Sequence, residues 1–169
     1  NDGSIGSIKK KFPLLTIIKS EINLGYAGGC NLGAKNASND LLIFLNNDTT
    51  HESGWINFLV DTINKNENIG MVQPKILNYY EKEQFDYAGA SGGFLDIFCF
   101  PFTRGRIFNS IEKDIGQYND SIEIFWASGC SFIVRKNLFF QLNMFDEKLF
   151  AHMEESDLCC KSKVAGYKS

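Results

Sequence analysis

The run at 41–45, LLIFL, constrains the fold of this chain more than any other stretch. Five consecutive apolar residues are typical of a strand buried on both faces, and such strands belong mostly to parallel sheets covered by helices. Segments with helical features lie on both sides of it, at 26–37, where glycines weaken the helix, and at 54–65. This alternation predicts an α/β fold with a mostly parallel sheet.

Four more strands are expected along the chain. The patterns predict strands at 14–19 and at 69–77, the second of them limited by Pro74, which cannot donate a backbone hydrogen bond. Two further apolar segments, at 122–129 and 131–135, are strand candidates separated by a small turn.

The C-terminal part predicts one more helix and the middle predicts an insertion. A helix is expected within 154–165, with Gly166 as its C-terminal cap. The segment at about 79–119 is rich in Gly, Phe and Asp and has little periodicity. A functional loop region or a small hairpin inserted into a single domain over 1–169 would explain it.

The composition excludes some classes of function. A net charge of −3 offers no basic surface for a nucleic-acid backbone, so we expect no nucleic-acid partner. No apolar run reaches the ~20 residues of a membrane span. Without a visible signal peptide, the chain is expected to be cytoplasmic. It begins in turn-forming residues and ends just past a helix stop, which indicates a piece of a longer protein, truncated at both ends.

A carboxylate follows the predicted strand at 41–45. Asp48, flanked by Asn46, Asn47 and Thr49, would lie beyond the carboxyl end of the strand, where α/β sheets bind ligands. Oxygen ligands of this kind suit Mg²⁺ or Mn²⁺, which are held by one or two carboxylates plus phosphate and water. Alternatively, Asp48 caps a helix that starts near Ser53 or closes an Asx turn.

The glycine-rich segment NLGYAGGCNLGAKNA, 23–37, is a second candidate site. Glycines at a helix start let a backbone approach a ligand, and the helix N-terminus favours phosphate. The spacing matches neither the P-loop nor the Rossmann fingerprint. Close packing of the helix on the sheet is the alternative.

The segment MEESDLCC supplies a third cluster, with Glu154, Glu155 and Asp157 within one helical turn. Neighbouring acids raise each other's pKa, which suits one of them to act as a general base near neutral pH. The alternative is the ordinary preference for negative charge at a helix N-terminus.

The motifs NLGYAGGCNLG, LLIFLNNDT, WASGCSFIVRK and FDEKLFAHMEESDLCCKSKVAGYK occur in this order. Together they resemble the family-two glycosyltransferases of GT-A fold, and most of all the bacterial rhamnosyltransferase-like branch that builds surface polysaccharides. The resemblance implies a Rossmann-like three-layer sandwich. Family members begin with two further strands that hold the base and ribose of the donor, and they continue past AGYK.

The resemblance also implies roles for individual residues. Asp48 corresponds to the last acid of the D-x-D motif and would hold Mn²⁺ or Mg²⁺. Glu155 falls at the catalytic base, with Glu154 or Asp157 as alternatives. The residues matched to nucleotide-sugar binding are Asn23, Gly25, Gly28, Asn31, Gly33, Asn46 and Asn47. Those matched to the acceptor side are Trp126, Ser128 and Gly129.

The implied reaction is inverting transfer of a sugar from a nucleotide-diphosphate donor to a hydroxyl of a saccharide or lipid-linked acceptor. One alternative is a non-catalytic truncated domain that binds donor weakly. The other is a different GT-A-like nucleotide-sugar enzyme, such as a nucleotidyltransferase. The aromatic run FCFPF, 98–102, packs a core or loop, or else forms an apolar platform for peripheral contact with the inner face of the membrane.

Overall fold

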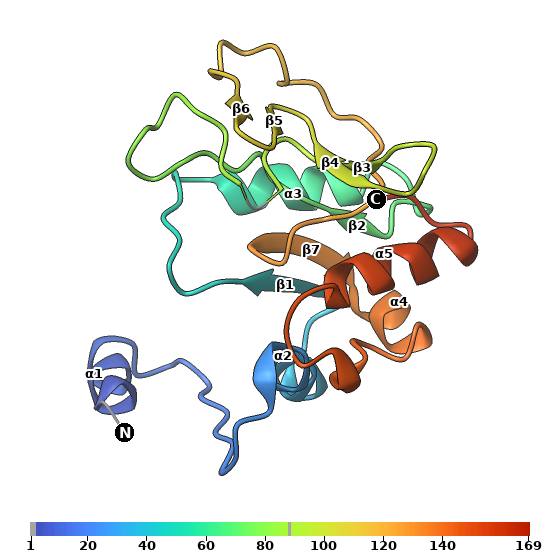
Figure 1. The fold of residues 1–169 in the computed structure, drawn as a ribbon. Coiled ribbons are helices and arrows are strands. Elements are labelled where there is room, and N and C mark those ends of the chain that lie inside the picture. The colour runs from blue at the N-terminus through green and yellow to red at the C-terminus, as the bar shows by residue number, and fades with distance from the viewer. Residues whose placement is uncertain (1–2, 88) are drawn as a thin grey trace.

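The computed structural model describes residues 3–87 and 89–169, and the described part mixes helices and sheets, which confirms the α/β class (Figure 1). Its helices are α1 (Ser4–Lys11), α2 (Gly25–Asn36), α3 (Trp55–Ile63), α4 (Lys136–Gln141), the 3₁₀ helix η1 (Glu147–Leu149) and α5 (Glu154–Val164). Its strands are β1 (Leu41–Leu45), β2 (Met71–Val72), β3 (Gly93–Leu95), β4 (Pro101–Thr103), β5 (Arg106–Ile107), β6 (Ser110–Ile111) and β7 (Ser131–Arg135).

The central sheet has the order β1-β7-β2, and β7 pairs antiparallel with both neighbours. The prediction of a mostly parallel sheet is therefore wrong for the described part of the chain, where the one parallel contact is an isolated bridge between Ile69 and Lys168. The run at 41–45 correctly indicated a strand with helices on both sides. Burial on both faces does not fix the direction of the neighbouring strand, because an antiparallel strand can be covered equally well.

The strand directions decide where the loops meet. Since β1 and β2 both run antiparallel to β7, they point the same way. Their carboxyl ends therefore lie at one edge of the sheet, together with the amino end of β7. The segments after Leu45, after Val72 and before Ser131 are brought to this edge.

One face of the sheet packs against α2, α4 and α5. Phe44 of β1 lies at the centre of this core, with its ring centroid 5.0–5.1 Å from those of Phe132, Phe139 and Phe145. On the other face, Leu59 and Ile63 of α3 pack against the sheet around Ile133. Helices thus cover both faces, with α3 above the sheet and α2 and α4 below it in Figure 1.

The predicted helices at 26–37, 54–65 and 154–165 are confirmed as α2, α3 and α5. Gly166 follows α5 with a φ of 88°, and its N–H donates to the carbonyl of Lys163 (3.0 Å). The predicted C-terminal cap is confirmed, because glycine adopts this left-handed conformation without steric penalty.

The strand predictions had mixed outcomes. The strand at 131–135 is confirmed, whereas the strand at 69–77 shortens to β2. Residues 122–129 form only an isolated bridge between Trp126 and Gly93. The described residues 14–19 form no strand, and Leu14 is 98% exposed, because a strand pattern needs a partner strand to pair with and none lies beside it here.

The segment at 79–119 contains the small hairpin sheet that was one of the two interpretations of it. Strands β3-β4-β5-β6 form an antiparallel sheet in this order. Its glycines allow close packing against the segment before β7. A β-carbon on Gly93 would lie 2.1 Å from the indole of Trp126, and one on Gly89 would lie 2.4 Å from Cβ of Ser128.

Candidate functional site

Hydrogen bonds join the polar segments at the carboxyl edge of β1 and β2. The backbone N–H of Asn46, just after β1, donates to the carbonyl of Cys130 (3.0 Å). Gln73, just after β2, accepts from the N–H of Ser128 (2.7 Å) and donates to the carbonyl of Gly89 (3.1 Å). These hydrogen bonds hold together the segments that follow β1 and β2 and the segment that precedes β7.

Asp48 lies on this edge with its side chain exposed, in the turn after β1. Burial raises the pKa of the Cys130 thiol, and the charges of Asp48 and Asp86 raise it further. The helix-cap alternative for Asp48 is wrong, because α3 begins after Gly54 and no side chain caps its N-terminus in the described structure.

The backbone donors at the start of α2 already have protein partners. The N–H of Gly25 donates to Oδ1 of Asn23 (2.9 Å), and those of Tyr26 and Ala27 donate to the carbonyl of Phe150 (2.8 and 3.3 Å). The groups that were expected to face phosphate therefore tie α2 to the segment before α5.

Packing explains two of the glycines in α2. A β-carbon on Gly25 would lie 2.6 Å from the ring of Phe150, and one on Gly28 would lie 2.9 Å from Cβ of Leu24. Gly33 is exposed, and nothing within 4 Å would meet a β-carbon there. Close packing thus accounts for Gly25 and Gly28, but against Phe150 and Leu24 and not against the sheet, and it gives no reason for Gly33.

Asn31 is buried within the core side of α2. Its Nδ2 donates to the carbonyl of Phe145 (3.0 Å) and to Oε1 of Glu147 (3.1 Å). Its Oδ1 accepts from the N–H of Phe145 (3.1 Å). The side-chain amide of Asn31 therefore holds the segment before η1 against α2. Asn31 could contact a nucleotide sugar only if these hydrogen bonds were broken.

The acidic cluster at the start of α5 lies against the segment that leads into β7. Glu155 is half-buried, and a β-carbon on Gly129 would lie 3.5 Å from its Oε1. Burial raises the pKa of Glu155, and the charge of Glu154 adds to the rise. Hydrogen bonds from the backbone N–H groups of Glu155 and Gly129 and the charge of His152 act in the opposite direction.

The other two acids have different surroundings. Glu154 is only 4% exposed, and its Oε2 has no hydrogen-bond partner in the described structure. Asp157 forms an ion pair with Lys161 one turn later (2.5 Å). Of the three, Glu155 is the carboxylate that is neither fully enclosed nor paired with a lysine.

Of the residues matched to the acceptor, Gly129 adjoins this position. A β-carbon on Gly129 would have both the Glu155 carboxylate and the Tyr26 hydroxyl as neighbours. Ser128 is buried, and its Oγ accepts from the N–H of Cys130 (3.1 Å). The indole N–H of Trp126 donates to the carbonyl of Phe94 (3.2 Å), so this ring ties the segment before β7 to the small sheet.

Sequence reasoning missed three residues of the site. Tyr26 donates its hydroxyl to the carbonyl of Gly129. Gln73 hydrogen-bonds to Ser128 and Gly89, and the charge of Asp86 adds to the raised pKa of Cys130. Gln73 stands just after a predicted strand, which was a usable signal. Tyr26 and Asp86 gave none, because their roles depend on contacts far apart in the sequence.

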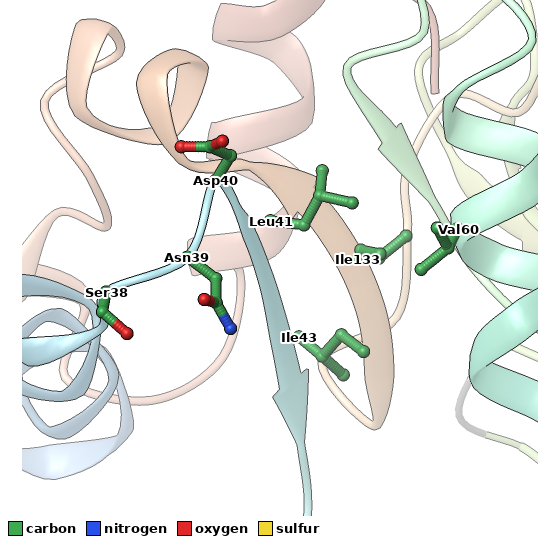
Figure 2. A pocket seen from close by; sticks show the side chains of 7 residues that line it. All are labelled: Ser38, Asn39, Asp40, Leu41, Ile43, Val60 and Ile133. Carbon is green, nitrogen blue, oxygen red and sulfur yellow. The ribbon is translucent and has the colours of Figure 1, made fainter.

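Two recesses adjoin β1. The first lies at the start of the strand, where Leu41 and Ile43 face Val60 of α3 (Figure 2). It contains none of the predicted site residues. The second runs along the other side of β1 and includes Gly33 and Cys30 of α2.

Within residues 3–87 and 89–169, neither a metal-binding cluster nor a membrane-spanning helix is present. No group of three or more His, Cys, Asp or Glu side chains is placed to hold a metal ion. None of the described helices has the length and apolar character that crossing a membrane requires.

Comparison with known families decides the class of protein. The sequence profile of glycosyl transferase family 2 matches residues 1–140. The chain belongs to glycosyl transferase family 2. Comparison with curated proteins gave no match.

Membership in glycosyl transferase family 2 supports glycosyltransferase activity in general, with a nucleotide-sugar donor and an acceptor. The matched region contains the glycine-rich helix α2, the turn with Asp48 and the segment before β7. It ends before α5, so the assignment of the acidic cluster depends on its geometry.

Proposed function

We propose that this protein is an inverting glycosyltransferase of GT-A fold, with Glu155 as general base and Asp48 as ligand of a divalent cation. One observation supports the proposal above the others. The turn that carries Asp48 is hydrogen-bonded to Cys130 through the N–H of Asn46 (3.0 Å), and the Glu155 carboxylate lies against Gly129, the preceding residue. A base and a cation site therefore border the same short segment.

The reaction follows from these positions. The acceptor hydroxyl gives its proton to the Glu155 carboxylate while its oxygen attacks the anomeric carbon of the donor sugar. The new glycosidic bond forms as the bond between that carbon and the diphosphate oxygen breaks, and the nucleoside diphosphate leaves with the electron pair. A single displacement inverts the anomeric configuration.

The surroundings of Glu155 suit a base. Burial raises its pKa, so the carboxylate holds a proton more strongly than an exposed glutamate does. It still has two backbone N–H groups to orient it. Asp157 is less suited, because its carboxylate is already engaged in the ion pair with Lys161.

Mn²⁺ or Mg²⁺ fits the ligands around Asp48. The carboxylate is exposed at the edge of the sheet, with the amides of Asn46 and Asn47 beside it in the same turn. An ion held by one carboxylate completes its shell with water and phosphate oxygens. When bound, it would offset the negative charge of the leaving diphosphate.

The finer assignments come from the resemblance of the motifs. The donor would lie near Asn23, Gly33, Asn46 and Asn47, and the acceptor near Trp126, Ser128 and Gly129. We propose a saccharide or lipid-linked acceptor and a role in bacterial surface-polysaccharide synthesis, in the rhamnosyltransferase-like branch. This would place the enzyme in the cytoplasm, in peripheral contact with the inner face of the membrane.

A donor panel tests the proposal. Full-length enzyme is incubated with UDP-, GDP- and dTDP-sugars and Mn²⁺, and the nucleoside diphosphate released is measured by mass spectrometry. We expect release from at least one donor, lost on chelation with EDTA and lost in Asp48→Ala. Glu52→Ala, an exposed acid close by, is the matched control and should keep both rate and metal dependence. Turnover and metal dependence that are unchanged in Asp48→Ala would refute the ligand role.

A further inference from the structure

Tyr26, in the first turn of α2, reaches Gly129, the residue against which the Glu155 carboxylate lies. Its hydroxyl donates to the carbonyl of Gly129 (2.9 Å), which is 103 residues later in the chain. Its ring packs toward Phe145 in the core, with the centroids 6.1 Å apart. The side chain is half-buried, so the ring is fixed while the hydroxyl reaches the site.

The hydroxyl of Tyr26 stays protonated at neutral pH. Burial raises its pKa, and the neighbouring Cys30, Glu155 and Glu154 raise it further. The thiol of Cys30 is also protonated, because burial raises its pKa to about 11. Tyr26 therefore remains a hydrogen-bond donor, and the Gly129 carbonyl is its acceptor.

The backbone of α2 also binds the segment that leads into α5. The N–H groups of Tyr26 and Ala27 hold the carbonyl of Phe150. Phe150, His152 and Met153 have φ values of 54°, 73° and 72°, a left-handed conformation that non-glycine residues adopt only when their surroundings enforce it. The start of α2 thus holds the strained segment that turns the chain into α5.

We propose that Tyr26 is a positioning residue for the base: its hydroxyl holds the Gly129 peptide at the distance at which the Glu155 carboxylate lies against it. A β-carbon built on Gly129 would be 3.6 Å from the Tyr26 hydroxyl and 3.5 Å from Oε1 of Glu155. Both groups therefore lie against the same face of Gly129, around the position that a β-carbon would occupy. This inference depends on the proposed role of Glu155.

A tyrosine that only fills the core would behave differently. Replacing Tyr26 by Phe keeps the ring and its packing and removes the hydroxyl alone. A purely structural role would lower stability without changing kcat at a temperature where the protein is folded. A positioning role lowers kcat with little effect on donor KM, because the misplaced group acts in the transition state.

The test compares Tyr26→Phe with Tyr118→Phe. Tyr118 is a half-buried tyrosine whose hydroxyl donates to Glu112 (2.8 Å), so its replacement removes a similar hydrogen bond away from the site. We expect Tyr26→Phe to lower kcat about tenfold with donor KM within about twofold. Hydrogen exchange, followed by mass spectrometry, should become faster in the peptide covering 127–131. Tyr118→Phe should change neither.

Glu155→Gln, measured in parallel, separates the two proposals. If Glu155→Gln keeps the full rate, the proposed base is wrong, and the Tyr26 proposal fails with it as a statement about catalysis. If Glu155→Gln loses the rate but Tyr26→Phe keeps its kcat, or loses it without faster exchange at 127–131, the base stands and the positioning role of Tyr26 is overturned.

Discussion

At the scale of single residues, the half-buried carboxylate of Glu155 lowers the stability of the folded protein when it is ionised. Burial disfavours its ionised form, which is why its pKa is raised above the usual 4.5. The folded chain therefore binds this proton more tightly than the unfolded chain. Its contribution to stability is fully present below about pH 4.5 and is lost as the pH rises through the folded-state pKa.

Glu155→Gln should for this reason stabilise the protein at neutral pH. The amide resembles the protonated acid and carries no charge to desolvate. We expect a higher Tm than the wild type at pH 7 and a difference that disappears near pH 4, measured by circular dichroism. Glu52→Gln, at an exposed position, should leave the Tm unchanged. A lower Tm for Glu155→Gln at pH 7 would contradict the burial argument.

At the scale of elements, the contact between α2 and the segment before α5 organises the site. Sequence reasoning located both helices because their boundaries follow local signals, such as the glycine at 166. It could not show that the N-terminus of α2 binds the carbonyl of Phe150, because that carbonyl is 124 residues away from Tyr26. The expectation that this N-terminus faces phosphate came from the local glycine pattern. The group that its N–H groups bind lies far away in the sequence.

Gly25→Ala should break this contact. Gly25 has a φ of 68°, and its α-carbon lies against Phe150, so a methyl group meets both backbone strain and a clash. We expect a loss of about 3 kcal/mol in the free energy of unfolding in urea.

Gly29→Ala is the control within the same helix. Gly29 is exposed, and nothing within 4 Å would meet its β-carbon. Alanine favours a helix over glycine, so this variant should gain about 0.5–1 kcal/mol. Equal effects of the two substitutions would show that the contact with Phe150 is not what Gly25 provides.

At the scale of the whole molecule, the layers of helices and sheet were easier to predict than the directions of the strands. Alternating patterns correctly indicated helices on both faces of a sheet. They gave the wrong direction for its strands, because apolar content indicates burial and does not indicate whether the neighbouring strand is parallel or antiparallel. The segment at 14–19 shows the same limit: Leu14 and Leu15 have a strand-like pattern, yet both are exposed where no strand pairs with them.

The candidate site was predicted in part for the same reason. Asp48 and Glu155 stand out as acids beside a strand end and a helix start. Their common border at Gly129 and Cys130 depends on β7 lying between β1 and β2, which only the structure provides.

The most direct test compares the rates of Glu155→Gln and Asp157→Asn in the full-length enzyme, with a donor that the wild type uses. A positioned base contributes about 10²–10⁴-fold, so Glu155→Gln should lose that factor in kcat. Asp157→Asn removes only the ion pair with Lys161 and should turn over at nearly the wild-type rate. Full activity in Glu155→Gln together with an inactive Asp157→Asn would contradict the assignment of the base.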